Sequence, residues 1–76
     1  MSRARLVSSM MTSAAYDPTS RVLEIEFATG AVYQYVEVPL DVFQEMLGAP
    51  SHGKFFHSRI RGAFACHRVA SEVSAQ

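Results

Sequence analysis

The stretch from residue 23 to residue 39, LEIEFATGAVYQYVEVP, constrains the fold of this chain more than any other. Apolar and polar side chains alternate on both sides of Thr29-Gly30, which is the pattern of two antiparallel strands joined by a tight turn. Because glycine adopts a positive φ freely, Thr29-Gly30 fits a two-residue hairpin loop. The loop length sets the register, and in this register the apolar side of the hairpin consists of Leu23, Ile25 and Phe27.

Two tyrosines fall on the polar face of the predicted hairpin. Tyr33 and Tyr35 are two residues apart, so an extended backbone puts both rings on one side of the sheet. The predicted register pairs them with Glu26 and Glu24, away from the apolar side chains. Exposed aromatic rings two positions apart are the arrangement with which a sheet stacks nucleic-acid bases. A shift of one residue in the register would move both rings to the other face.

The rest of the chain predicts two short helices and a final strand. Pro39 suits the first turn of a helix, and apolar residues at helical spacing follow it. Gly48 fits the position just after the end of that helix, and Ser51 fits the N-cap of a second helix, which Gly62 ends. Residues 63–69 alternate again and predict a last strand.

The expected fold class is α+β, in a small single domain with the order β-β-β-α-α-β. An N-terminal antiparallel meander packs on two short helices, and a C-terminal strand completes the domain. We expect the domain to span residues 8–69, with residues 1–7 and 70–76 as flexible tails. A chain of 76 residues makes one domain, and an apolar content of 49% against 18% charged residues supplies its core.

Nothing in the residue spacing points to catalysis or to a bound cofactor. No nucleophile, base and orienting group stand at a spacing that would bring them together. His52 and His57 are five residues apart, so on a helix they diverge by about 140° and do not share a metal ion. The single cysteine, Cys66, excludes an internal disulfide and a multi-cysteine zinc site, and we expect it to be buried as a small hydrophobe. We therefore expect no enzyme activity, no cofactor, no metal and no small-molecule substrate.

Neither a membrane span nor a secretory signal is expected. No run of residues approaches the length of about 18 apolar residues that a membrane helix needs. The basic start of the chain lacks the apolar stretch of a signal peptide. The expected location is therefore the cytoplasm.

Charge is unevenly distributed along the chain, although the formal net charge is zero. Between residues 17 and 45, six carboxylates accompany one cation, Arg21. Between residues 51 and 68 there are four cations and three histidines, without an acidic residue. A basic region of this kind can steer an anionic partner toward the surface. Alternatively, the two regions pack together and their charges compensate.

Several short motifs, taken in order and spacing, resemble the KTSC domain family, which is named for its place at the C-terminus of some lysyl-tRNA synthetases. The resemblance runs from Ser8 to Val69, and its most characteristic element is the Y-x-Y of Tyr33-Gln34-Tyr35. His57 stands where the family pattern has an Asn, and Phe64 stands where the aromatic residue is usually Tyr. The other matching positions are Tyr16-Asp17, Gly30, Val38-Pro39, Ser51, Gly53, Phe56 and Ile60-Arg61. The resemblance implies a free-standing bacterial member of a family without an established activity, for which RNA binding is suspected from the synthetase association.

The leading hypothesis from the sequence is a non-catalytic accessory domain that binds tRNA or other RNA. In it, the rings of Tyr33 and Tyr35 stack on bases, and the cations Lys54, Arg59 and Arg61 contact phosphate. A second interpretation makes both tyrosines structural, with buried rings and hydroxyls bonded to the main chain. A third is a protein–protein interaction module that forms a homodimer through a sheet face or a sheet edge, without nucleic acid. The solvent exposure of the two tyrosine rings decides between these hypotheses, and it also matters whether the basic stretch of residues 51–68 lies beside the tyrosines.

Overall fold

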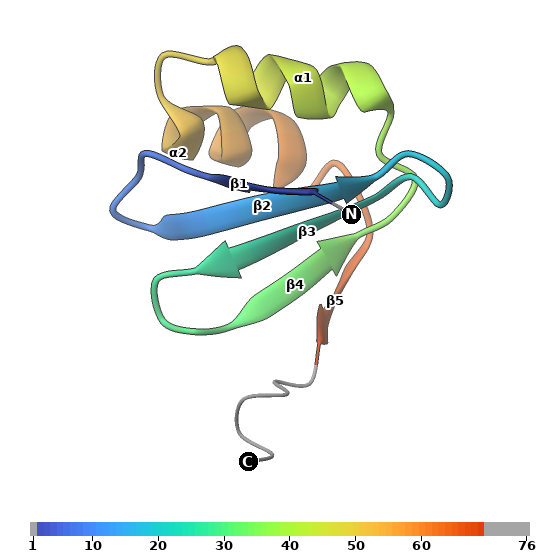
Figure 1. Ribbon diagram of the computed structural model, residues 1–76, viewed down its shortest axis with the longest axis horizontal. Coiled ribbons are helices and arrows are strands. Elements are labelled where there is room, and N and C mark those ends of the chain that lie inside the picture. Colours follow the sequence, from blue (N-terminus) through green and yellow to red (C-terminus); the bar gives the residue numbers. More distant parts are fainter. Residues whose placement is uncertain (1, 70–76) are drawn as a thin grey trace.

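The computed structural model describes residues 2–69, which form one antiparallel sheet with helices on one of its faces (Figure 1). The five strands lie in the order β1-β2-β3-β4-β5, so every strand pairs with its neighbours in sequence order. The elements are β1 (Ser2–Arg5), β2 (Met11–Asp17), β3 (Val22–Phe27), β4 (Val32–Tyr35), α1 (Leu40–Gly48), α2 (His52–Phe55), the π-helical turn η1 (Phe56–Ile60) and β5 (Cys66–Val69). The expected α+β class is confirmed, with one strand more than the sequence predicted.

The additional strand is β1, which lies in the segment that we expected to be a tail. It pairs antiparallel with β2, and Ala4 lies opposite Ala14. Residues 2–5 carry two arginines and no alternating pattern, so their sequence contains no strand signal of its own. The strand forms because the edge of β2 offers unpaired backbone groups. The second predicted tail, residues 70–76, lies outside the described residues.

The register of the central hairpin differs from the predicted one by one residue. The Phe27 amide donates to the carbonyl of Ala31 at 2.8 Å, so the loop holds three residues rather than two. Gly30 closes it with a φ of +95°, as in a three-residue loop that ends on a left-handed residue. Tyr35 therefore lies opposite Leu23, and Tyr33 lies opposite Ile25. The prediction that the tyrosines share a face with Glu24 and Glu26 was wrong.

A bulge in β2 changes the side-chain pattern a second time. Met11 pairs with Phe27, whereas Ser13 pairs with Glu26, so Thr12 is an extra residue in this strand. As a result Met11 enters the core, while Ser13 projects to the opposite face of the sheet.

The helices cover the face of the sheet that carries the apolar side chains. Met46 from α1 and Ile60 from η1 are both fully buried. The Tyr16 hydroxyl donates to the carbonyl of Val38 at 2.5 Å, and its ring stacks on Phe43 of α1 with the ring centres 5.1 Å apart. The core also includes Leu6, Met11, Ala14, Leu23, Ile25, Tyr35, Val38 and Phe56. Tyr16 thus joins β2 both to the segment before α1 and to α1 itself.

The opposite face of the sheet is polar, and no described helix covers it (Figure 1). Arg3 donates to Ser13 at 2.7 Å and pairs with Glu24, and Ser13 donates in turn to Glu26 at 3.1 Å. Gln34 donates to Glu24 at 2.9 Å. The two carboxylates are therefore neutralised or hydrogen-bonded on the side of the sheet away from the tyrosines.

The ends of the helices agree with the sequence in part. The Ser51 hydroxyl accepts the backbone amide of Lys54 at 3.2 Å, so the predicted N-cap is confirmed. Gly48 is the last residue of α1 rather than the first residue after it, and it has no positive φ. Ala49 is extended and ends the helix, because a residue that precedes proline is disfavoured in the helical region.

Candidate functional site

A cleft of about 330 Å³ opens beside β4, between the sheet and η1. Its apolar wall is formed by Met10, Phe27 and Phe56, and its polar side by Tyr33, Tyr35, His57, Arg61 and Cys66, with Gly62 at the margin. None of these residues carries a carboxylate. Aromatic rings, hydrogen-bond donors and one guanidinium therefore converge on a small volume without a negative charge.

The two tyrosines contribute differently to this cleft. Tyr35 is only 5% exposed, and the Phe56 ring meets it edge to face with the ring centres 5.7 Å apart. Tyr33 is half-buried and packs edge to face against Phe27, also at 5.7 Å. The expectation that both rings are exposed was wrong for Tyr35, which is part of the core. Tyr33 alone keeps a partly accessible ring.

Arg61 reaches the cleft because of the π-helical turn before it. Its backbone amide donates to the carbonyl of Phe56, five residues back, at 2.8 Å. Such wide turns often occur at functional sites, where they redirect a side chain. Nη1 of Arg61 lies 3.5 Å from Nδ1 of His57, so the two basic side chains are neighbours. Gly62, with a φ of +80°, then turns the chain toward β5.

The phenol of Tyr35 stays protonated over the whole physiological pH range. Burial, together with the neighbouring Cys66 and Tyr33, raises the pKa of Tyr35 to about 12, while Arg61 opposes the shift. Cys66 lies directly across the strand pair from Tyr35. The Tyr35 hydroxyl is therefore a neutral hydrogen-bond donor, next to a thiol and a guanidinium.

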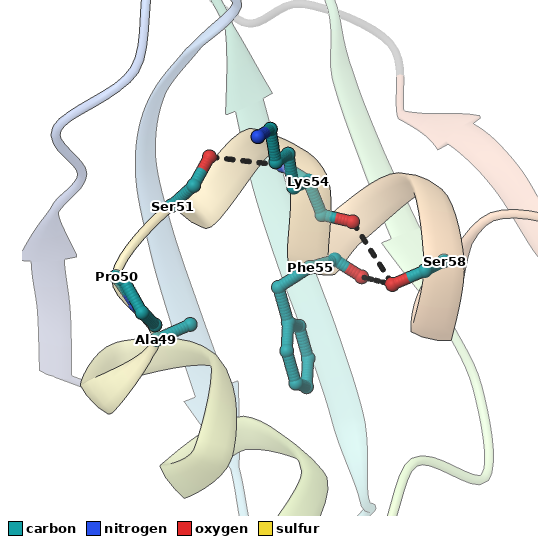
Figure 2. A pocket seen from close by; sticks show the side chains of 6 residues that line it. All are labelled: Ala49, Pro50, Ser51, Lys54, Phe55 and Ser58. Carbon is teal, nitrogen blue, oxygen red and sulfur yellow. Dashed lines mark hydrogen bonds between the residues drawn. The ribbon is translucent and has the colours of Figure 1, made fainter.

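The other two predicted cations do not line this cleft. Lys54 lines a separate hollow between the end of α1 and α2, together with Pro50 and Phe55 (Figure 2). Arg59 forms an ion pair with Glu45 of α1 at 2.8 Å and lies over the ring of Phe55 at 5.1 Å. The structure thus brings together Tyr33, Tyr35 and Arg61, while Arg59 lies outside the cleft and Lys54 also lines a neighbouring hollow that shares Met10 and His57 with it.

The hollow in Figure 2 is a weaker candidate for a site. Its serine hydroxyls are engaged with the main chain, because Ser51 caps α2 and Ser58 donates to the carbonyl of Lys54 at 3.0 Å. The remaining lining residues, apart from the lysine, are apolar. Specific sites need a few polar groups that converge on a ligand, and this hollow offers only the Lys54 ammonium.

Cys66 differs from its predicted position, and His52 has a structural role that the sequence did not predict. Cys66 is exposed, so the prediction of a buried cysteine was wrong. His52 accepts the Val7 amide at Nδ1 (3.1 Å) and lies 3.3 Å from the Leu47 carbonyl at Nε2, which ties the connection between β1 and β2, and also α1, to α2. Within residues 2–69, no three His, Cys, Asp or Glu side chains gather to hold a metal ion. The same residues contain no helix that is long and apolar enough to cross a membrane.

Sequence reasoning missed most of the cleft. Phe27 was assigned to the apolar side of the hairpin and Phe56 to the family pattern, without a common site, and His57 was considered as a metal ligand and as a departure from that pattern. The signal that could have found the cleft is the loop after Phe27. Counting three loop residues instead of two places Tyr33 and Tyr35 beside Phe27, on the helix-covered face.

The fold and the cleft define a class, namely small α+β domains in which two short helices cover one face of an antiparallel sheet. Within that class the chain belongs to the KTSC domain family, whose model matches residues 7–64. A crystal structure of a KTSC domain protein from Yersinia pestis is similar to it, with a TM-score of 0.87 and 39% identity over 91% of this chain and 97% of that one.

Two kinds of relative share this domain. An uncharacterized protein of Stutzerimonas stutzeri is 46% identical over 57 residues, which cover 75% of this chain and 80% of that protein. A lysine–tRNA ligase of a Nostoc species is 43% identical over 55 residues, which cover 72% of this chain. The chain matches only 10% of that ligase. The domain thus occurs both in small proteins and as a small part of lysine–tRNA ligases.

Proposed function

We propose that this protein is a non-catalytic accessory domain that binds RNA, with tRNA as the first candidate, through the cleft beside β4. The observation that carries the proposal is the convergence of Tyr33, Tyr35 and Arg61 on a cleft without a carboxylate. The occurrence of the domain in lysine–tRNA ligases supports an RNA context. A tRNA partner also requires a cytoplasmic location, which stays a prediction.

The observed register removes an objection to RNA binding. On the predicted hairpin, Glu24 and Glu26 shared the tyrosine face and would have repelled a phosphate backbone. In the structure they lie on the other face, where Arg3 and Gln34 hold Glu24. The surface around Tyr33 instead includes Arg68, which lies opposite it on β5.

The interaction energies set the expected strength of binding. A base stacked on an aromatic ring contributes about 1–3 kcal/mol by alanine substitution, and only Tyr33 offers a partly accessible ring. Each phosphate contact to single-stranded nucleic acid adds about −0.7 to the slope of log K against log salt. One stacked base and one or two phosphate contacts make a weak, salt-sensitive site. Such a site suits an accessory domain rather than an independent RNA-binding protein.

The test is a titration of fluorescently labelled tRNA with the protein at several salt concentrations. We expect binding that weakens with salt, and Arg61→Gln should weaken it and reduce the salt slope by about 0.7. Arg59→Gln is the matched control, because Arg59 has the same charge but pairs with Glu45 outside the cleft. Equal losses in the two variants, or no binding at low salt, would refute an RNA interface at this cleft.

A homodimer is the second candidate, and the outer edge of β5 favours it. This edge has no partner strand within residues 2–69, and Cys66, His67 and Arg68 are all exposed along it. Two β5 edges could pair antiparallel across a two-fold axis. Sedimentation equilibrium tests the dimer, and amide exchange that slows in residues 66–69 as the protein concentration rises would locate it at this edge.

A further inference from the structure

The Tyr35 hydroxyl is a polar group for which the described protein provides no strong partner. The residue is only 5% exposed, and its hydroxyl neighbours the Cys66 thiol, a weak hydrogen-bond partner, but bonds to no nitrogen or oxygen atom within residues 2–69. The contrast is Tyr16, equally buried, whose hydroxyl donates to Val38. In the described part of the chain, every fully buried side-chain oxygen has a hydrogen-bond partner. The Tyr35 hydroxyl has no nitrogen or oxygen partner there and is therefore not fully buried, and it borders the cleft.

The chemistry around this hydroxyl restricts what can fill the cleft. Phe27 and Phe56 present aromatic surface, which favours a flat apolar group. The high pKa of Tyr35 keeps its hydroxyl a donor, so the flat group should carry a hydrogen-bond acceptor. Arg61, with His57 beside it, favours an anionic oxygen, and no carboxylate in the lining opposes one.

We propose that the cleft is a pocket for one unpaired nucleotide, whose base enters among the aromatic rings and accepts a hydrogen bond from Tyr35, while its phosphate pairs with Arg61. This inference rests on the proposed RNA-binding function and specifies the unit that is bound. A volume of about 330 Å³ is at the lower end of the range of ligand pockets, which is about 300–1,000 Å³. A base within a duplex has its edge paired and its faces stacked, so the nucleotide must be unpaired to enter.

The experiment is an NMR titration of the full chain with adenosine monophosphate, uridine monophosphate, ribose 5-phosphate and inorganic phosphate. We expect the two nucleotides to shift the amide signals of Tyr35, Arg61 and Cys66, and to bind at least about fivefold tighter than ribose 5-phosphate, because stacking of the base is worth about 1–3 kcal/mol. Inorganic phosphate should shift Arg61 and leave Tyr35 unchanged.

Tyr35→Phe is the decisive variant, because it removes one oxygen atom and keeps the ring packed against Phe56. The loss of one hydrogen bond should weaken nucleotide binding about three- to tenfold without changing phosphate binding. Thermal stability should stay close to that of the unchanged protein, since the neighbour of the hydroxyl in residues 2–69 is the Cys66 thiol, which bonds only weakly. Arg59→Gln is the control outside the cleft and should leave nucleotide binding intact.

The source of the nucleotide is decided by comparing three ligands of one base composition. A single-stranded oligonucleotide that binds more tightly than the monophosphate, with a duplex binding more weakly, supports a nucleotide within RNA. A free monophosphate that binds more tightly than the oligonucleotide supports a free nucleotide, and in that case the pocket stands while the RNA-binding function fails. Binding of tRNA without any shift of the Tyr35 signal, and without an effect of Tyr35→Phe, overturns the pocket while RNA binding survives.

Discussion

Replacing Tyr16 with phenylalanine should destabilise the protein by removing one buried hydrogen bond. Tyr16 is 5% exposed and Val38 is fully buried, so water cannot replace the hydroxyl as a donor to the Val38 carbonyl. An acceptor left in this way costs about 1–3 kcal/mol. The ring itself remains stacked on Phe43, so no cavity adds to the cost. For a domain of this size, a loss of about 2 kcal/mol lowers Tm by about 8–16 °C.

The assay is urea unfolding followed by circular dichroism, with thermal unfolding as a second measurement. The midpoint should fall while the slope m stays constant, which indicates a change of stability and not of the denatured state. Tyr33→Phe is the matched control, because the Tyr33 ring is half-buried and its hydroxyl bonds to no nitrogen or oxygen atom within residues 2–69. We expect this control to change stability by less than about 0.5 kcal/mol. If Tyr16→Phe costs no more than Tyr33→Phe, then the Tyr16 hydroxyl does not hold the segment before α1.

Three further predictions concern the hairpin loop, the Tyr35 phenol and the helix pair. Gly30→Ala should lower the free energy of unfolding by about 1–2 kcal/mol. The added methyl group has room, but the φ of +95° is unfavourable for alanine. Gly48→Ala, also in open space but without a positive φ, should instead stabilise α1 by up to about 1 kcal/mol in the same urea assay, and equal losses at both sites would contradict this. The pKa of Tyr35 is raised from 10.0 to about 12, so an unfolded chain loses this proton first and stability should fall as the pH rises from 10 to 12. Absorbance titration of the phenols should show the last step lost in Tyr35→Phe, and an unchanged curve would refute the shift. A double-mutant cycle of Glu45→Gln with Arg59→Gln should give a coupling of about 0.2–1 kcal/mol that shrinks with salt, because both side chains are half exposed, and a larger, salt-independent coupling would contradict this.

Local signals in the sequence predicted the helical part of the fold well. Ser51 caps α2 as its residue type indicates, and Gly62 turns the chain out of η1 with a positive φ. These features depend on residues close together in the chain, so single-residue preferences decide them. The π-helical form of η1 and the pairing of β1 were not predicted, because each depends on the neighbouring elements against which it packs.

The candidate site was predicted less well, because its geometry depends on register. Tyr33, Tyr35 and Arg61 line one cleft, yet Tyr35 was placed on the exposed face and is buried. The alternation in residues 32–36 does not mark one face as the buried one, because the valines fall on one side of the strand and the tyrosines on the other. The hydrogen bond from Phe27 to Ala31 closes the loop in the observed register, and the residue types Thr29-Gly30 are compatible with both registers. Lys54 and Arg59 lie outside the cleft because helix packing, rather than spacing along the chain, determines where they point.

The loop of Ala28, Thr29 and Gly30 has a consequence for how this domain can diverge. Insertion or deletion of a single codon there would exchange the two sides of β4 and bring Gln34 into the interior. Changes of two codons would preserve the arrangement and alter only the reach of the tip. Natural variants of this hairpin should therefore differ in loop length by even numbers of residues. Removal of two residues would leave a loop of one residue, which is too short for a hairpin, so three residues are the practical minimum.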